Sequence, residues 1–99
     1  MKINNIVWLD PIVDKLARKH GVDTDEVDEV FNNKPRFHFV EKGRREGEDI
    51  YMALGRTDEG RYLTVLFIQK FGNDALVLSA RDMAPSEKKR YARKKTPRV

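Results

Sequence analysis

The chain has 99 residues, of which 39% are hydrophobic and 36% charged, and its formal net charge is +4. This length favours one domain with a modest hydrophobic core. The absence of cysteine excludes disulfides, a thiolate nucleophile and a metal site of the zinc-finger type. No apolar run approaches the ~20 residues of a membrane span, and the apolar patch before Asp10 is too short for a secretory signal. We therefore expect a cytoplasmic protein that does not contact a membrane.

The positive charge is concentrated at the C-terminal end. Residues 81–99 hold eight Lys or Arg and two acidic residues, a net +6, whereas residues 1–80 carry a net −2. Such segregation points to a polyanionic partner, either a nucleic acid or an acidic protein. We expect a single domain over residues 1–93 and a basic tail over residues 94–99. The alternative for the tail is a frayed, solubilising end.

The first elements have clear start and stop signals. Residues 5–8 read as a short strand, and Asp10 is placed as the N-cap of a helix with Pro11 at its first position. Apolar residues then recur at helical spacing over residues 11–20, and Gly21 is placed to end the helix. A second helix follows, with Thr24 as its cap, an acidic outer face, and its end at the NNKP motif.

From Arg36 the apolar pattern changes to period two, which predicts strands. Strands are expected from Arg36 onwards, at residues 50–56, 62–70 and 75–80, and a basic helix opens at Pro85. The run LTVLFIQ is almost continuously apolar, so we expect the central strand there, covered on both faces. The predicted order is β-α-α-β-β-β-β-α. It describes an α+β fold with a small, mostly antiparallel sheet, two N-terminal helices and a C-terminal basic helix.

Three segments carry a resemblance to a known family: KLARKHGVDTDEVDEVF, ALGRTDEGRYLTVLF and LSARDMAPSEKKRYARK. In this order and spacing, from Trp8 to about Arg93, the chain resembles the BrnT toxins of bacterial type II toxin–antitoxin pairs. The resemblance implies a RelE-like ribonuclease fold and a cognate antitoxin with a ribbon-helix-helix domain, so that the complex contacts DNA through the antitoxin. In one departure from the family, Leu9 separates Trp8 from Asp10, and no role for Trp8 is carried over.

Without clustered metal ligands, the plausible ribonuclease chemistry is attack by the RNA 2′-hydroxyl on the adjacent phosphate. It requires a base, an acid, and cations that stabilise the charge developing on the phosphate oxygens. Arg81 follows the apolar strand ALVLSA, and its planar guanidinium suits two-pronged contact with phosphate. The alternative is an ion pair with a carboxylate such as Asp82 or Asp49.

Two further arginines and one histidine are candidates. Arg56 and Arg61 flank the TDEG connection and could approach one anion, or they could be ordinary turn-flanking surface residues. His20 has a side chain suited to proton transfer near neutral pH, but it also falls on the apolar stripe of the first helix and could simply pack there. Lys19 is its neighbour and points in a different direction.

The last helix supplies the remaining candidates. Glu87 is a possible base, although a carboxylate in the first turn also stabilises a helix. Tyr91 lies one turn further on and could stack on a base or pin the helix to the sheet. His38, flanked by two phenylalanines, reads as structural.

The sequence therefore predicts a metal-independent ribonuclease toxin without a cofactor, acting on RNA to inhibit translation. The alternative is a non-enzymatic module that binds nucleic acid or an acidic partner. The candidate catalytic residues are Arg81, His20, Arg56 and Glu87, and the candidate RNA-binding residues are Arg61, Lys19, Lys88, Tyr91 and Lys95.

Overall fold

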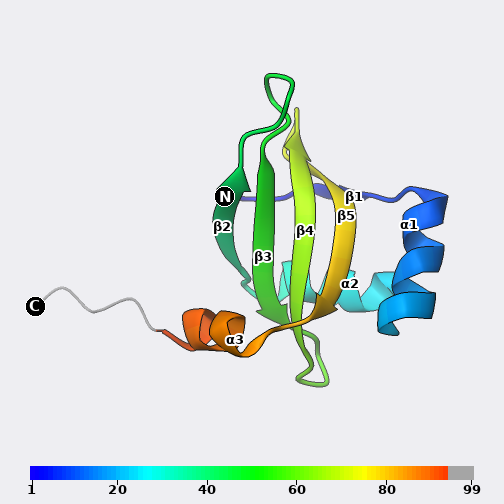
Figure 1. Cartoon of the computed structure of the whole chain (residues 1–99), viewed down its shortest axis with the longest axis vertical. Helices are drawn as coiled ribbons and strands as arrows, with labels where there is room; N and C mark the ends of the chain where they lie inside the picture. Colours follow the sequence, from blue (N-terminus) through cyan, green and yellow to red (C-terminus); the bar gives the residue numbers. More distant parts are fainter. Residues whose placement is uncertain (94–99) are drawn as a thin grey trace, which may run out of the picture.

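A computed structural model describes residues 1–93 of the chain (Figure 1). The strands are β1 (Asn5–Val7), β2 (Arg36–Glu41), β3 (Ile50–Arg56), β4 (Tyr62–Lys70) and β5 (Asp74–Asp82). The helices are α1 (Asp10–Lys15), its π-helical continuation η1 (Leu16–His20), α2 (Thr24–Asn32) and α3 (Pro85–Ala92). The predicted basic tail, residues 94–99, lies outside the described residues. No described helix is long and apolar enough to cross a membrane.

The strands form one sheet in the order β1-β5-β4-β3-β2. β1 runs parallel to β5, and the other three pairings are antiparallel. The predicted α+β class and element order are confirmed, with η1 continuing α1. β4 lies in the middle of the sheet, as LTVLFIQ predicts. Its expected cover on both faces is incomplete, because Leu66 and Ile68 are only half-buried.

The starts of α1 and α2 differ by one residue from the predicted N-caps. Asp23, not Thr24, is the N-cap of α2: its carboxylate accepts the Glu26 N–H at 2.9 Å, and the Glu26 carboxylate accepts the Asp23 N–H at 3.2 Å. This reciprocal capping box satisfies two free helix donors. Leu9 occupies the N-cap position of α1, so Asp10 is already helical. Gly21 ends η1 as predicted, with a φ of +60° that suits glycine.

One face of the sheet carries the hydrophobic core. In Figure 1, α2 passes behind the sheet and α1 lies beside β5, which η1 also contacts. The alternate residues Leu63, Val65 and Phe67 of β4 point to this face and are fully buried. The rings of Phe31 and Phe67 meet edge to face, with centroids 5.4 Å apart. The helices are therefore held by burial of the apolar faces that the sequence pattern predicts.

The opposite face, which we call the open face, is described by the strand register. Its first row across β3, β4 and β5 is aliphatic and contains Ile50, Ile68 and Leu76. The second row contains Met52, Leu66 and Ser79. The next row contains Leu54, Thr64 and Arg81, and the last contains Arg56 and Tyr62. α3 lies at this lower end and contacts β3 (Figure 1). The open face thus changes from aliphatic to cationic along the strands.

Candidate functional site

The Glu87 carboxylate fastens α3 to the open face. Its two oxygens accept hydrogen bonds from both terminal nitrogens of Arg81, at 2.7 and 2.8 Å. Oε1 also accepts from the Thr64 hydroxyl at 2.9 Å and from the Ala84 N–H at 2.8 Å. A strand residue, a strand-end arginine and the first turn of α3 therefore meet at one carboxylate.

These contacts set the ionisation of Glu87. Hydrogen bonds from Arg81, with smaller contributions from Ala84 and Thr64, outweigh burial and lower the pKa of Glu87 to about 2. The same pairing raises the pKa of Arg81 above its ordinary value. Glu87 is consequently a carboxylate at neutral pH, and both of its oxygens already accept hydrogen bonds. In this arrangement it orients Arg81.

Arg81 keeps part of its surface in solvent. Its side chain is 38% exposed, against 15% for Glu87, and Nη1 also donates to the Asp82 carbonyl oxygen. The ion pair with a carboxylate, weighed from the sequence as the alternative role of Arg81, is formed, but its partner is Glu87 rather than Asp82 or Asp49. Part of the Arg81 side chain is therefore open to solvent, although both terminal nitrogens are hydrogen-bonded to Glu87.

A second group of cations and aromatic rings adjoins this pair. The Arg56 guanidinium lies 4.9 Å from the Tyr62 ring centroid, and Lys88 Nζ lies 5.5 Å from it. The Tyr62 and Tyr91 rings meet edge to face at 5.9 Å. Tyr91 thus helps pin α3 to the sheet, the structural role weighed for it from the sequence. We call Arg56, Tyr62, Arg81, Lys88 and Tyr91 together the cationic ledge.

The cationic ledge borders an open hollow. The hollow has a volume of about 590 Å³, and its lining includes Arg56, Thr57, Gly60 and Tyr91. Asn33 fixes this side of the site, because its amide donates to the Arg56 carbonyl at 2.9 Å and to the Asp58 carboxylate at 3.0 Å. A cation and a tyrosine beside a fixed loop can contact the phosphate and base of a nucleotide.

Arg61 forms hydrogen bonds within the protein, whereas Arg56 lies over the Tyr62 ring. Its guanidinium donates to Asp82 at 2.8 Å, to Glu26 at 3.1 Å, and to the carbonyl oxygens of His20 and Gly21 at 3.0 and 2.8 Å. These bonds join the end of η1, the start of α2 and the end of β5. Its donors are therefore engaged within the protein.

The other predicted residues are not gathered at the cationic ledge. His20 is half-buried at the end of η1, on the helical side of the sheet, and Lys19 beside it is exposed. Lys95 lies outside the described residues. Thus the structure brings Arg56, Arg81, Glu87, Lys88 and Tyr91 together and leaves His20 and Lys19 on the helical side.

Several residues at the site were missed from sequence. Tyr62 and Thr64 lie inside an apolar strand, and only the pairing of β4 with β3 and β5 places them beside arginines. Arg36 donates to the carbonyl oxygen of Arg93 at the end of α3. A register assignment from the TDEG hairpin could have placed Tyr62 opposite Arg56.

His38 is half-buried on β2. It pairs with Met52 on the open face, and its Nε2 is buried without a hydrogen-bond partner within residues 1–93. Burial, with Arg90 and Arg36 nearby, lowers its pKa, so the neutral imidazole is favoured.

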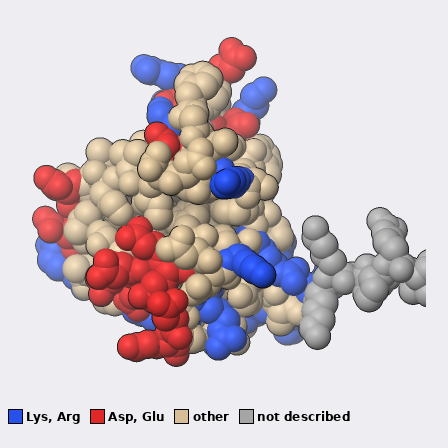
Figure 2. All heavy atoms as spheres, turned by 180° about the vertical axis from the view of Figure 1, so that it is seen from behind, with Lys and Arg blue, Asp and Glu red and all other residues tan. Residues whose placement is uncertain are grey.

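The reverse side of the molecule has the opposite charge. Figure 2 shows acidic side chains gathered there, and α2 contributes Asp25, Glu26, Asp28 and Glu29.

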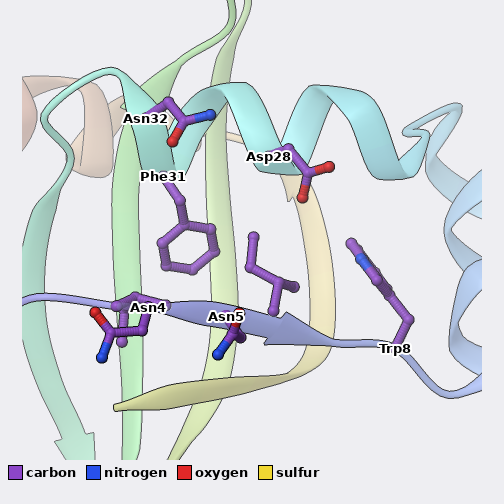
Figure 3. Close-up of a pocket in the computed structure, with 8 residues that line it drawn as sticks. Asn4, Asn5, Trp8, Asp28, Phe31 and Asn32 are labelled. Atoms are coloured by element: carbon purple, nitrogen blue, oxygen red, sulfur yellow. The ribbon is translucent and has the colours of Figure 1, made fainter.

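A hollow of about 380 Å³ lies between β1 and α2, and Trp8, Asp28 and Phe31 are in its lining (Figure 3). Burial, with Asp25 nearby, raises the pKa of Asp28. Carboxylates disfavour a phosphate here, so the cationic ledge is the better nucleic-acid site.

These features define the class of protein: a small α+β domain with a cationic ledge over one end of its sheet. A family model described as "Ribonuclease toxin, BrnT, of type II toxin-antitoxin system" matches residues 10–87. The chain therefore belongs to the BrnT family, as its resemblance indicated. The crystal structure of the Brucella abortus ribonuclease toxin BrnT is similar in fold, with a TM-score of 0.61 and 22% sequence identity. The similarity covers 81% of this chain and 96% of that one. No curated protein sequence matches.

Proposed function

We propose that this BrnT family member is a metal-independent endoribonuclease that inhibits translation. The observation that carries the proposal is the cationic ledge, where exposed positive charge and aromatic rings share one end of the open face. Phosphate contacts supply affinity, and aromatic stacking holds unpaired bases. RNA is accordingly expected to bind across α3 and the adjoining hollow.

In the proposed reaction, the RNA 2′-oxygen forms a bond to its own 3′-phosphorus as the bond to the next 5′-oxygen breaks. The 2′-hydroxyl proton is removed and a proton is delivered to the leaving oxygen, which yields a 2′,3′-cyclic phosphate and a 5′-hydroxyl. Arg56 and Arg81 are the cations proposed to stabilise the negative charge on the phosphate. Glu87 is a positioning residue, because it holds the Arg81 guanidinium in a two-pronged contact.

The proton-transfer residue must be tested separately. With a pKa of about 2, Glu87 is a weak base, and it would have to release Arg81 to accept a proton. His20 has the better intrinsic chemistry but lies on the helical side of the sheet. We keep His20 and Glu87 as the candidates proposed from sequence.

The engagement of Glu87 also favours a second candidate function, a non-enzymatic module that binds nucleic acid through the cationic ledge. Such a module needs the ledge and does not need a free base. The two functions agree on binding and differ on cleavage.

Cleavage of a defined single-stranded RNA by the purified full chain, with and without EDTA, separates them. The ribonuclease proposal expects cyclic-phosphate products at an unchanged rate in EDTA. It also expects at least a ten-fold loss in Arg56→Ala, while the exposed control Arg44→Ala keeps the wild-type rate. RNA binding without cleavage would support the binding module, and cleavage abolished by EDTA would refute metal independence.

For the partner, we propose an antitoxin that carries a ribbon-helix-helix domain and recruits the complex to DNA, with both proteins in the cytoplasm. Family membership in a toxin–antitoxin system supports a protein partner. Co-purification with the product of the adjacent reading frame, followed by an operator-binding assay on each protein and on the complex, tests this. Operator binding by the toxin without its partner would contradict it.

A further inference from the structure

The hollow between β1 and α2 is a second concave site, on the helical side of the sheet and away from the cationic ledge (Figure 3). Its volume of about 380 Å³ falls within the ~300–1,000 Å³ of small-molecule sites. β1 and its flanking residues contribute Asn4, Asn5 and Trp8, and α2 contributes Asp28 and Phe31. The proposed ribonuclease function uses none of these side chains.

Asp28 is a half-buried carboxylate in this lining that has no cationic partner. Figure 3 shows it pointing from α2 into the space beside Trp8. Within residues 1–93 it forms no salt bridge, and no described lysine, arginine or histidine lines the hollow. Burial, with Asp25 nearby, raises its pKa because both disfavour the charged form. A bound cation would stabilise that charge.

The two asparagines of the lining are fixed through their amide nitrogens. Asn4 Nδ2 donates to the Gly72 carbonyl oxygen at 3.2 Å, and Asn5 Nδ2 donates to the Asp74 carboxylate at 3.2 Å. Their amide oxygens accept no hydrogen bond from the part of the chain that the structure describes. Together with the Asp28 carboxylate, they are acceptors for a ligand that carries several N–H donors.

Two aromatic rings complete the lining. Phe31 is held in place by an edge-to-face contact with Phe67, with ring centroids 5.4 Å apart. Trp8 is half-buried, and among the described residues no lysine or arginine lies over its ring. Indole attracts cations more strongly than the other aromatic side chains do. A flat cation can therefore contact the Trp8 ring and the Asp28 carboxylate together.

These features fit a guanidinium group better than other ligands. A guanidinium is planar, carries five N–H donors, pairs with a carboxylate through two parallel hydrogen bonds, and stacks on aromatic rings. An ammonium group is a strongly hydrated point charge without a flat face. A divalent metal ion would find a single carboxylate here, and residues 1–93 contain no cluster of three His, Asp or Glu side chains that could hold one. The carboxylates of α2 would repel a phosphate.

We propose that the hollow between β1 and α2 binds a guanidinium group, with Asp28 as its ion-pair partner and Trp8 as its stacking surface. The amide oxygens of Asn4 and Asn5 accept further hydrogen bonds from it. Two sources carry this group, a free small molecule such as arginine and an arginine side chain of a polypeptide. The inference does not depend on the proposed ribonuclease function, because it uses another side of the molecule.

The first test follows the fluorescence of Trp8, the single tryptophan, while the purified full chain is titrated with L-arginine at constant ionic strength. L-citrulline is the control ligand, because it replaces the guanidinium by a neutral urea group of similar shape. We expect a saturable change with arginine and a Kd on the order of 1 mM, as for other small ligands. Citrulline and L-lysine should bind at least ten-fold more weakly. Equal responses to arginine and citrulline, or no response to arginine, would overturn the proposal.

A variant pair tests the carboxylate. Asp28→Asn removes the charge and keeps the shape of the side chain, and Asp14→Asn removes an exposed carboxylate of α1 outside the hollow. We expect Asp28→Asn to raise the Kd for arginine at least ten-fold and Asp14→Asn to leave it within two-fold of wild type. Because Asp28 has no ion pair to lose, its variant should fold with an unchanged or higher urea midpoint. An unchanged Kd in Asp28→Asn would refute the site.

A second measurement uses the unaltered protein and locates the ligand. In ¹H–¹⁵N spectra, we expect arginine to shift the indole N–H of Trp8 and the side-chain amides of Asn4 and Asn5. The signals of α3 should stay unchanged. Shifts confined to the exposed acidic side of α2, around Asp25, would show that arginine only screens surface charge, and the proposal would fail.

A capped Gly-Arg-Gly peptide distinguishes the two sources of the guanidinium. If the peptide binds at least as tightly as free arginine, the site takes an arginine side chain of a polypeptide. If it binds more weakly, the ligand is a small molecule, and both results support the guanidinium site. If arginine binds as expected but the wild-type chain cleaves no RNA, the proposed ribonuclease function fails and the guanidinium site stands.

Discussion

Neutralising Glu87 tests the ion pair that fastens α3 to the sheet. Glu87→Gln removes the negative charge that Arg81 contacts at 2.7 and 2.8 Å, and the amide oxygen can still accept from Thr64 or Ala84. A fall in pKa from 4.5 to about 2, at ~1.4 kcal/mol per pKa unit, corresponds to about 3 kcal/mol. Because the Arg81 side chain is 38% exposed, solvent screening reduces this figure. We expect Glu87→Gln to lower the free energy of unfolding at pH 7 by about 2 kcal/mol.

The pH dependence follows from the direction of the pKa change. The pKa of Glu87 is lower in the folded protein, so the stabilisation is fully present above pH 4.5 and is lost as the pH falls towards about 2. The difference between wild type and Glu87→Gln should therefore shrink by about half between pH 7 and pH 3.

Urea unfolding followed by the fluorescence of the single tryptophan, Trp8, measures both quantities. The control is Glu46→Gln, since Glu46 is exposed in the connection between β2 and β3. A change below about 0.5 kcal/mol at pH 7, where surface substitutions fall, would refute the argument. So would a difference between wild type and Glu87→Gln that does not change with pH.

Four other predictions follow from the contacts described. Arg61→Met should cost about 1–3 kcal/mol in urea unfolding, because it leaves the carbonyl oxygens of His20 and Gly21 without this donor; an unchanged midpoint would contradict it. Gly55→Ala should cost a similar ~1–3 kcal/mol, since an added Cβ would lie 2.8 Å from Val30 Cγ1, and thermal unfolding checks this. The lowered pKa of His38 means that its protonation opposes folding, so wild type should lose stability relative to His38→Gln as the pH falls below 6.5; parallel pH profiles would contradict it. Tyr91→Ala should weaken RNA binding in fluorescence anisotropy by about 1–3 kcal/mol while Tyr91→Phe stays near wild type, and equal losses would exclude stacking.

Much of the fold could be predicted from the sequence because its signals are local. The apolar patterns on either side of the TDEG connection predict the bounds of β3 and β4, and Pro85 marks the start of α3, as the structure has them. The same patterns cannot decide between competing caps. Asp23 and Thr24 are both good N-cap residues, and Asp23 is selected because its carboxylate and that of Glu26 can bond reciprocally.

The candidate site was less predictable from the sequence. The sequence shows where charged residues are, but it does not show which residues of other elements they contact. Arg56 and Arg61 look equivalent beside the TDEG turn. The structure places Arg56 over the Tyr62 ring and surrounds Arg61 with two carboxylates and two carbonyl oxygens. For Arg81, the sequence analysis weighed an ion pair with a carboxylate as the alternative to phosphate binding. The structure contains such an ion pair, but its partner Glu87 lies one turn into the next helix.

By itself, the sequence determined the element order, the concentration of positive charge in residues 81–99, and the family to which the chain belongs. These depend on spacing, composition and motif order, which are properties of the linear chain. The tertiary structure decided which cations remain open to an anion. It also placed Ile50, Ile68 and Leu76 side by side across β3, β4 and β5 on the same face of the sheet. The physical reason is that strand register and helix docking join residues far apart in sequence. Whether a charge is available to a ligand depends on the neighbours that such pairing supplies.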